Sequence, residues 1–298
     1  MADIDKLLTE KRNEKTMKLD EMTPLEIISV MNQEDHNAVN AVHDALPQIG
    51  RVIEWTTQSL MNHGRIIYIG AGTSGRLGIL DAVECPPTFG VDYNTVMGII
   101  AGGENAFIKA KEGAEDDPAL GREDLEKINL SSSDVVIGLA ASGRTPYVIG
   151  ALQYAKEIGC HCAAIACNPE SEIAKAADIA IELLTGPEIL TGSTRLKAGT
   201  AEKMVLNMIS TASMVGIGKA YQNLMVDVKQ TNEKLVRRAE NIVMEAAGCD
   251  RETAKATLCD ANGEAKTAIT MLLLHCDMET ARKALAQAGG KIKNAIPK

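Results

Sequence analysis

The feature that most constrains the fold is a regular alternation in the middle of the chain, where short apolar runs alternate with helix-like stretches. Apolar runs of four to eight residues rich in Ile and Val predict buried strands. Strands that alternate with helices form parallel sheets covered by helices. We therefore predict an α/β fold, a doubly wound parallel sheet with helices on both faces. The predicted strands are Arg65 to Ile69, Thr95 to Ile100, Asp134 to Ala140, His161 to Cys167 and Ile179 to Leu183.

Helices are predicted between and after these strands from their apolar spacing. The proline pair Pro86-Pro87 is expected to stop the first of them, because proline lacks the N–H that a helix interior needs. The predicted helices are Arg76 to Glu84, a helical stretch around Asn105 to Glu112, Tyr147 to Ile158, Glu172 to Ala177 and the long Ala/Met-rich stretch Leu196 to Tyr221.

The two ends of the chain read as helical additions to the sheet. Residues 1–20 are charged and predict an arm, whereas Thr23-Pro24 with Glu26 is a helix start. A second helical stretch is expected over residues 37–63, with a break near Pro47. Four shorter helices are expected from Asn232 onward. The last three resemble a small ubiquitin-associated-like bundle and are expected at roughly Asp250 to Leu258, Gly263 to Leu274 and Asp277 to Leu285. We expect three parts, with boundaries at residues 1–54, 55–220 and 221–298.

Composition excludes several classes of protein. The formal charge of −9 disfavours a general nucleic-acid or anionic-membrane binder. No apolar run approaches the ~18 residues of a membrane helix, and the N-terminus has no signal-peptide pattern. Seven cysteines, an odd number without a CxxC pair, are typical of free thiols in a reducing compartment. Histidines show no metal-ligand spacing. We expect a cytoplasmic protein with no metal and no cofactor.

Three polar turns follow predicted strands and open predicted helices. Glycine lets a backbone approach a ligand closely, hydroxyls donate hydrogen bonds, and a helix N-terminus favours anions. Such turns at one edge of a parallel sheet predict a phosphate or sugar-phosphate site. The candidate binding residues are Gly72, Thr73, Ser74 and Gly75 in the first loop, Ser142, Gly143, Arg144 and Thr145 in the second, and Ser193 and Thr194 in the third.

The first loop matches no common nucleotide motif. Its Gly70-x-Gly72-x-x-Gly75 spacing is that of a dinucleotide fingerprint, but no clear acidic residue ends the next strand. No Gly-Lys-Ser/Thr follows, which excludes a Walker loop. In the third loop, Arg195 and Lys197 either pair with an anion or lie at the surface.

The three loops together resemble a sugar isomerase (SIS) domain, over roughly residues 55–220. A more specific resemblance, to the N-acetylmuramic acid 6-phosphate etherase family, spans nearly the whole chain. A generic SIS domain shares the loops but not Glu84 before Cys85-Pro86-Pro87 together with Glu115. The segments that carry the resemblance are residues 72–88, 101–104, 112–116, 142–147 and 191–200.

The etherase resemblance implies a reaction and a catalytic pair. The family cleaves the lactyl ether of N-acetylmuramic acid 6-phosphate, by elimination and then water addition, without a metal. The products are N-acetylglucosamine 6-phosphate and D-lactate. The resemblance assigns Glu84 as the acid that protonates lactate and Glu115 as the base at C2. It also implies a phosphosugar substrate, and because SIS-domain proteins are usually dimeric we expect a homodimer with its site near the interface. The acidic charge and the lack of a long apolar run predict no nucleic-acid or membrane partner.

The residues are compatible with that chemistry. In the ring-opened sugar, the C2 proton lies beside the C1 aldehyde and is acidic, so a carboxylate can remove it while a second carboxyl protonates the departing lactate. The 31 residues between Glu84 and Glu115 are about one βα unit, which is expected to bring both to one crevice. Two alternatives remain: an aldose–ketose isomerase, for which Glu84 is dispensable, and a non-catalytic phosphosugar sensor similar to glucokinase regulatory proteins.

Overall fold

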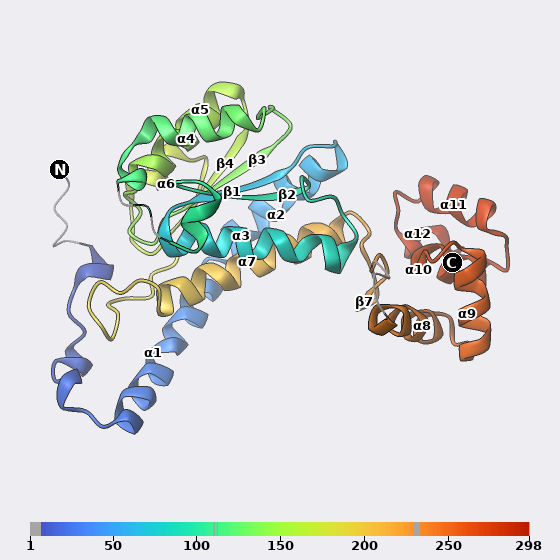
Figure 1. Cartoon of the computed structure of the whole chain (residues 1–298), viewed down its shortest axis with the longest axis horizontal. Helices are drawn as coiled ribbons and strands as arrows, with labels where there is room; N and C mark the ends of the chain where they lie inside the picture. The colour runs from blue at the N-terminus through green and yellow to red at the C-terminus, as the bar shows by residue number, and fades with distance from the viewer. Residues whose placement is uncertain (1–6, 110, 112, 229–232, 298) are drawn as a thin grey trace. The chain divides into compact units, whose positions relative to one another are not determined.

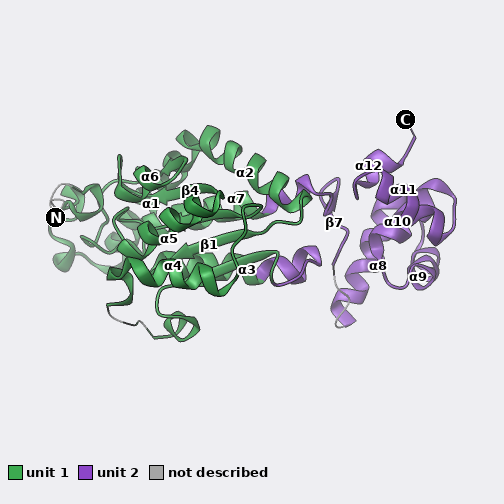
Figure 2. Cartoon of the chain, turned by 90° about the horizontal axis from the view of Figure 1, so that it is seen from above, with its two compact units in different colours: residues 1–83, 94–210 green, residues 84–93, 211–298 purple. Residues whose placement is uncertain are grey.

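The computed structural model describes residues 7–109, 111, 113–228 and 233–297, which form two compact units. One unit holds residues 1–83 and 94–210, and the other holds residues 84–93 and 211–298 (Figure 2). The three-part division expected from the sequence stays a prediction. The first unit contains the sheet and all three polar loops, so it is the unit that positions the candidate site.

The first unit is built on a parallel sheet, which confirms the predicted fold class. In the described residues the sheet has five strands in the order β2-β1-β3-β4-β5, and every neighbouring pair is parallel. All five expected strands are present, each within a residue or two of its predicted ends. The strands are β1 (Ile66–Gly70), β2 (Val96–Ile100), β3 (Val135–Leu139), β4 (His161–Ala166) and β5 (Ile179–Glu182).

Helices cover both faces of this sheet (Figure 1). On one face Ile67 and Val136 pack with Val148 and Leu152 of α5 in a continuous buried cluster. On the other face α3 approaches closely, because a Cβ added to Gly78 would lie 3.0 Å from the Tyr68 Cβ. The helices that begin in this unit are α1 (Pro24–Asp44), α2 (Leu46–Met61), α3 (Gly72–Phe89), α4 (Pro118–Lys127), α5 (Pro146–Ile158), α6 (Glu172–Ala176) and α7 (Lys197–Gly216).

The first N-terminal helix begins where the sequence predicts, but the boundary between the two helices lies later in the chain than expected. The Thr23 side chain accepts from the Glu26 N–H and the Glu26 carboxylate accepts from the Thr23 N–H, which confirms the capping box. The break near Pro47 is also confirmed, since α2 begins at Leu46. The expected second helix from residue 37 is wrong, because α1 continues through that point. The arm before α1 folds into three short 3₁₀ turns: η2 (Leu8–Glu10), η3 (Glu14–Thr16) and η4 (Leu19–Glu21).

Two helices predicted between the strands are corrected by the structure. Helix α3 continues through Pro86 and Pro87 to Phe89. This costs little, because only the Ala82 and Val83 carbonyls lose their donors and the helix ends two residues after Pro87. The stretch around residues 105–112 is a 3₁₀ turn, η5 (Glu104–Phe107), as far as it is described.

Helix α4 was missed, although Asp117 before Pro118 is a helix start: the Asp117 side chain accepts from the Ala119 N–H. Helix α7 ends at Gly216, earlier than expected. A short hairpin follows it, formed by β6 (Ala220–Tyr221) and β7 (Leu224–Met225).

The second unit is helical around its own core, as expected. Ala239, Val243, Ala268 and Ile269 are fully buried in one cluster. The three helices expected near the C-terminus are present within two residues of their predicted ends, and their ubiquitin-associated likeness stays a prediction. Asn232 lies outside the described residues. The helices of this unit are α8 (Glu233–Ala247), α9 (Arg251–Asp260), α10 (Ala265–Leu274), α11 (Met278–Gln287) and the short α12 (Ile292–Ala295).

Candidate functional site

A cavity of about 330 Å³ in the first unit joins the second polar loop to one of the two candidate carboxylates. Glu115, in the 3₁₀ turn η6 (Ala114–Asp116), has an exposed side chain. Arg144 supplies a cation, and Ser142 and Thr145 supply hydroxyls. The cavity can therefore hold a phosphorylated ligand beside a general base. It is lined by Leu7, Glu10, Glu115, Asp116, Ser142, Arg144, Thr145 and Pro146.

The second loop depends on Gly143. This residue has φ +74°, a left-handed conformation that glycine adopts without strain. An added Cβ would lie 2.3 Å from the Ser171 Cβ, so no larger residue fits. The turn closes through the Gly143 N–H, which donates to the Ala140 carbonyl at 2.8 Å. Helix α5 begins at Pro146 on the cavity wall, and its N-terminus favours an anion there.

Asn168 fastens this loop to the N-terminal arm, a role that the sequence analysis missed. Its side chain is 1% exposed and donates to the carbonyls of Ala141 and Ser142, each at 3.2 Å. The same amide donates to Thr9 Oγ1 at 3.0 Å and accepts from the Thr9 N–H at 3.3 Å. A polar residue directly after a buried strand is the only sequence signal for this role. The arm is thus part of the site, and its Leu7 and Glu10 line the cavity.

The first loop makes a tight turn at the end of β1. An added Cβ on Gly70 would lie 2.9 Å from the Gly75 nitrogen, and one on Gly75 would lie 2.8 Å from the Gly70 oxygen. Both glycines are therefore needed for this close backbone approach. Gly72 is exposed and Thr73 is half-buried. Ser74 is buried and turns inward, where its hydroxyl donates to Glu202 Oε1 at 2.9 Å.

The third loop packs against both the first loop and the arm. Glu188 caps α7, accepting from the N–H groups of Lys197 and Ala198. Gly199, in the first turn of α7, approaches Thr73 of the first loop, since its added Cβ would lie 3.5 Å from Thr73 Cγ2. Gly192 approaches Glu10 of the arm, since its added Cβ would lie 3.1 Å from Glu10 Oε2. Ser193 and Thr194 of this loop are half-buried and do not line the 330 Å³ cavity.

Lys197 does not face a ligand. Its side chain is buried and its Nζ lies 2.6 Å from Glu34 Oε2. Glu34 also accepts from Lys15 and Asn13. Burial acts to raise the pKa of Glu34, but hydrogen bonds from Lys15 and Lys197 outweigh it and lower that pKa to about 2. The pair fastens α1 to the start of α7. Arg195 is exposed.

Glu84 lies in the part of α3 that belongs to the second unit, and its side chain is exposed. The first loop opens the same helix at Gly72. Twelve residues at 1.5 Å each separate the two by about 18 Å along the helix axis. Glu84 and Glu115 belong to different units, so the expectation that they reach a common crevice stays a prediction.

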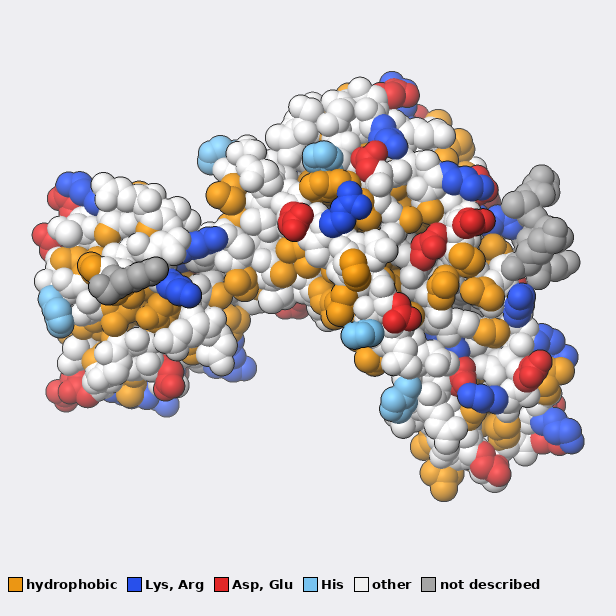
Figure 3. Space-filling view, turned by 180° about the vertical axis from the view of Figure 1, so that it is seen from behind, with side chains coloured by type: hydrophobic (Ala, Val, Ile, Leu, Met, Phe, Trp, Pro, Cys, Tyr) orange, Lys and Arg blue, Asp and Glu red, His pale blue; other side chains and the backbone are white. Residues whose placement is uncertain are grey.

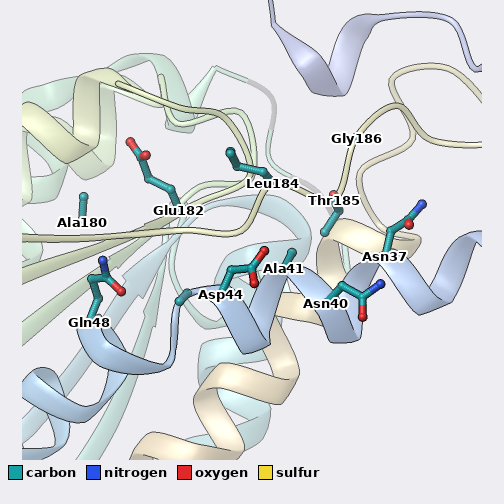
Figure 4. Close-up of a pocket in the computed structure, with 11 residues that line it drawn as sticks. Asn37, Asn40, Ala41, Asp44, Gln48, Ala180, Glu182, Leu184, Thr185 and Gly186 are labelled. Atoms are coloured by element: carbon teal, nitrogen blue, oxygen red, sulfur yellow. The ribbon is translucent and has the colours of Figure 1, made fainter.

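A larger cavity, of about 590 Å³, lies between α1, α2 and the edge strand β5 (Figure 4). Its charged lining residues are Asp44 and Glu182, joined by the amides of Asn37, Asn40 and Gln48. A lining with carboxylates and without lysine or arginine repels phosphate. Size alone therefore does not mark the candidate site in this chain.

Three further properties of the described residues bear on membrane spanning, thiol reactivity and metal binding. No helix there is long and apolar enough to cross a membrane. Cys160 and Cys162 are buried, as expected, and burial raises the pKa of each thiol to about 12. Within the same residues no three His, Cys, Asp or Glu side chains gather in a group able to hold a metal ion.

The fold and its loops define a SIS-domain protein. A family model described as "Glucokinase regulatory protein N-terminal SIS domain" matches residues 48–156, and one described as "SIS domain" matches residues 120–212. Among solved structures, a phosphoheptose isomerase from Neisseria gonorrhoeae matches with a TM-score of 0.50 and 18% identity, covering 64% of this chain and 98% of that one. At that identity the likeness shows the fold alone.

Sequence comparison identifies the family within this class. An N-acetylmuramic acid 6-phosphate etherase of Francisella tularensis is 59% identical, covering 91% of this chain and 92% of that protein. The etherase of Halalkalibacterium halodurans is 58% identical, covering 91% of this chain and 91% of that protein. The etherase of Pectobacterium atrosepticum is 59% identical, covering 90% of this chain and 88% of that protein. The chain belongs to the N-acetylmuramic acid 6-phosphate etherase family.

Proposed function

We propose that this protein cleaves the D-lactyl ether of N-acetylmuramic acid 6-phosphate and yields N-acetylglucosamine 6-phosphate and D-lactate. The observation that carries the proposal is the near-60% identity to etherases over nine-tenths of the chain. The cavity that joins Glu115 to Arg144 and two hydroxyls supports it. This reaction belongs to the recycling of cell-wall sugars, and we place the protein in the cytoplasm, where such phosphosugars are used.

The proposed chemistry is a carbon–oxygen lyase reaction. Glu115 removes the C2 proton of the ring-opened sugar, the electron pair forms a C2–C3 double bond, and the C3–O bond to lactate breaks. Glu84 gives its proton to the departing lactate oxygen. Water then adds at C3 and a proton returns to C2. The polar loops hold the 6-phosphate, with Arg144 and the α5 N-terminus supplying positive charge.

The 18 Å between Gly72 and Glu84 along α3 favours a site shared by two copies of the chain. In this arrangement Glu84 is contributed by one copy and Glu115 by the other. Exposed apolar side chains on α1 and α3 are suited to cover each other in a twofold dimer: Leu25 is 70% exposed, Ile28 59%, Val39 53% and Val83 46%. Figure 3 shows hydrophobic side chains at several places on one face of the protein.

Release of D-lactate from N-acetylmuramic acid 6-phosphate tests the proposal directly. We expect release that a chelator does not reduce, and a loss of at least about 100-fold in kcat for Glu115→Gln and Glu84→Gln. Glu123→Gln, an exposed glutamate on α4 outside the cavity, is the matched control and keeps parental activity. In ¹⁸O-labelled water, elimination puts the label on the sugar C3 hydroxyl and leaves the lactate unlabelled.

Two other outcomes point to the alternative functions. Aldose–ketose interconversion without lactate, unaffected by Glu84→Gln, identifies an isomerase. Phosphosugar binding without any turnover identifies a sensor, the reading favoured by the glucokinase-regulatory-protein model over residues 48–156. Either result would overturn the etherase proposal.

A further inference from the structure

Glu202 is a buried carboxyl directly beneath the first polar loop. It lies on α7, is 1% exposed, and accepts one hydrogen bond at Oε1 from the Ser74 hydroxyl, at 2.9 Å. Its other oxygen, Oε2, has no hydrogen-bond partner among the described residues. An ionised carboxylate buried with an unpartnered oxygen is costly, whereas a protonated carboxyl is tolerated. This position therefore favours the neutral form.

The groups around Glu202 do not supply a compensating charge. Ser74 faces it from α3, and Cys167, at the end of β4, is the buried thiol whose pKa it helps to raise, after burial itself. On α7, Lys203 pairs with Asp81 and Lys197 pairs with Glu34. Burial raises the pKa of Glu202 to about 8, although the Ser74 hydrogen bond acts to lower it. Near neutral pH most molecules then carry the proton.

The protonation state of Glu202 decides what the Ser74 hydroxyl can do, because that hydroxyl has a single hydrogen. An ionised Glu202 accepts it, as the hydrogen-bond geometry of the two residues allows. A protonated Glu202 instead donates to the Ser74 oxygen and leaves the Ser74 hydrogen for another acceptor. Ionised Glu202 also places a negative charge under the loop, which opposes a bound phosphate.

We propose that Glu202 is a positioning residue of the phosphate site, and that its protonated form sets the Ser74 hydroxyl to donate to the sugar phosphate. Binding a phosphosugar to the ionised form then takes up one proton from solvent onto Glu202. The inference rests on the proposed function to the extent that the first loop binds phosphate. No bond to the sugar is made or broken in this step.

The dissociation constant of N-acetylglucosamine 6-phosphate between pH 7 and pH 9.5 tests the proposal. In this range the phosphate is already a dianion, since its second pKa is about 6. With the Glu202 pKa at about 8, we expect binding about tenfold weaker at pH 9 than at pH 7. Glu202→Gln keeps an N–H donor for Ser74 at every pH, so its affinity is expected to be flat over the range. Glu123→Gln is the control and follows the parent.

A second readout can be taken on the parent alone, so its main result does not depend on a variant folding. Calorimetric titrations of the parent at pH 8.5, in two buffers with different ionisation enthalpies, report protons taken up on binding. With the Glu202 pKa at about 8, about three-quarters of the carboxyls are ionised at pH 8.5, so we expect uptake of about 0.75 proton for the parent and none for Glu202→Gln. Ser74→Ala separates the hydroxyl from the charge: it is expected to bind more weakly at pH 7 and to lose most of the pH dependence.

The contrary outcomes are distinct. The role of Glu202 is overturned if the affinity of the parent does not change with pH, or if the affinity of Glu202→Gln still falls tenfold between pH 7 and pH 9. A Ser74→Ala variant that keeps the full pH dependence overturns the hydroxyl step. Failure of parent and variants to bind the phosphosugar at any pH overturns the proposed function instead.

Discussion

At the scale of single residues, a few buried polar side chains hold the loops of the candidate site. Asn168, Glu188 and Glu202 are each 1% exposed, and each bonds to a loop or to the helix start that follows one. Buried polar groups are stable only when they are bonded, so each of these contacts fixes both partners. The loops are therefore held by the core beneath them as well as by their own turn residues.

Asn168→Ala is expected to loosen the second loop and the N-terminal arm together. The change removes the amide that bonds to Ala141, Ser142 and Thr9 and leaves their polar groups buried without it. We expect a loss of about 2–4 kcal/mol in the free energy of unfolding and at least about fivefold weaker phosphosugar binding. Urea unfolding and calorimetry measure the two effects.

The control for this prediction is Asn207→Ala, at an exposed position on α7 where the side chain accepts from Lys203. It is expected to change stability by less than about 0.5 kcal/mol. Unchanged affinity in a destabilised Asn168→Ala would mean that Asn168 supports the fold without positioning the loop.

At the scale of elements, the arm and α1 are fastened to the carboxyl end of the sheet through ion pairing. Lys197, at the start of α7, and Glu34, in the middle of α1, are both buried and 2.6 Å apart. Removing one member of a buried pair leaves an uncompensated charge, which typically costs about 3–5 kcal/mol. The start of α7 and its preceding loop thus depend on a residue more than 160 positions earlier in the chain.

Glu34→Gln is expected to destabilise the protein at pH 7 by about 3 kcal/mol. Because the pKa of Glu34 is about 2 in the folded protein and 4.5 ordinarily, its contribution is present above pH 4.5 and is lost as the pH falls toward 2. The stability difference between parent and variant should therefore shrink over that window, as measured by denaturant unfolding. Adding Lys197→Met removes the orphaned charge and should restore much of the loss; no recovery would contradict the pairing argument.

Elements were more predictable from the sequence than their contacts. The five strands and the Thr23 capping box follow from local patterns, namely apolar runs and a Thr-Pro-x-Glu start. The path of α3 through Pro86 and Pro87 does not follow from a local pattern, because two prolines near the C-terminus of a helix remove only two backbone hydrogen bonds. Local patterns also do not reveal that Ser74 turns inward onto Glu202, a contact between positions 128 residues apart.

At the scale of the whole molecule, the family assignment and the helix length together bear on the catalytic pair. Glu115 lies on the cavity wall, whereas Glu84 lies about 18 Å along α3 from the first loop. A substrate whose phosphate is held at the first loop of one chain would have to span that distance to meet Glu84 of the same chain. A site shared by two chains needs only that the exposed Glu84 side chain of one copy reaches the cavity of the other.

Mixing inactive variants distinguishes the two arrangements. In a heterodimer of Glu84→Gln and Glu115→Gln chains, a shared site pairs the intact Glu115 of one copy with the intact Glu84 of the other, and the second site loses both carboxyls. Random exchange of subunits makes half the dimers mixed, so about a quarter of parental activity should return. D-lactate release after mixing, with each variant alone as the control, measures this recovery. Sedimentation checks that mixed dimers form. If they form and no activity returns, both carboxyls act within one chain.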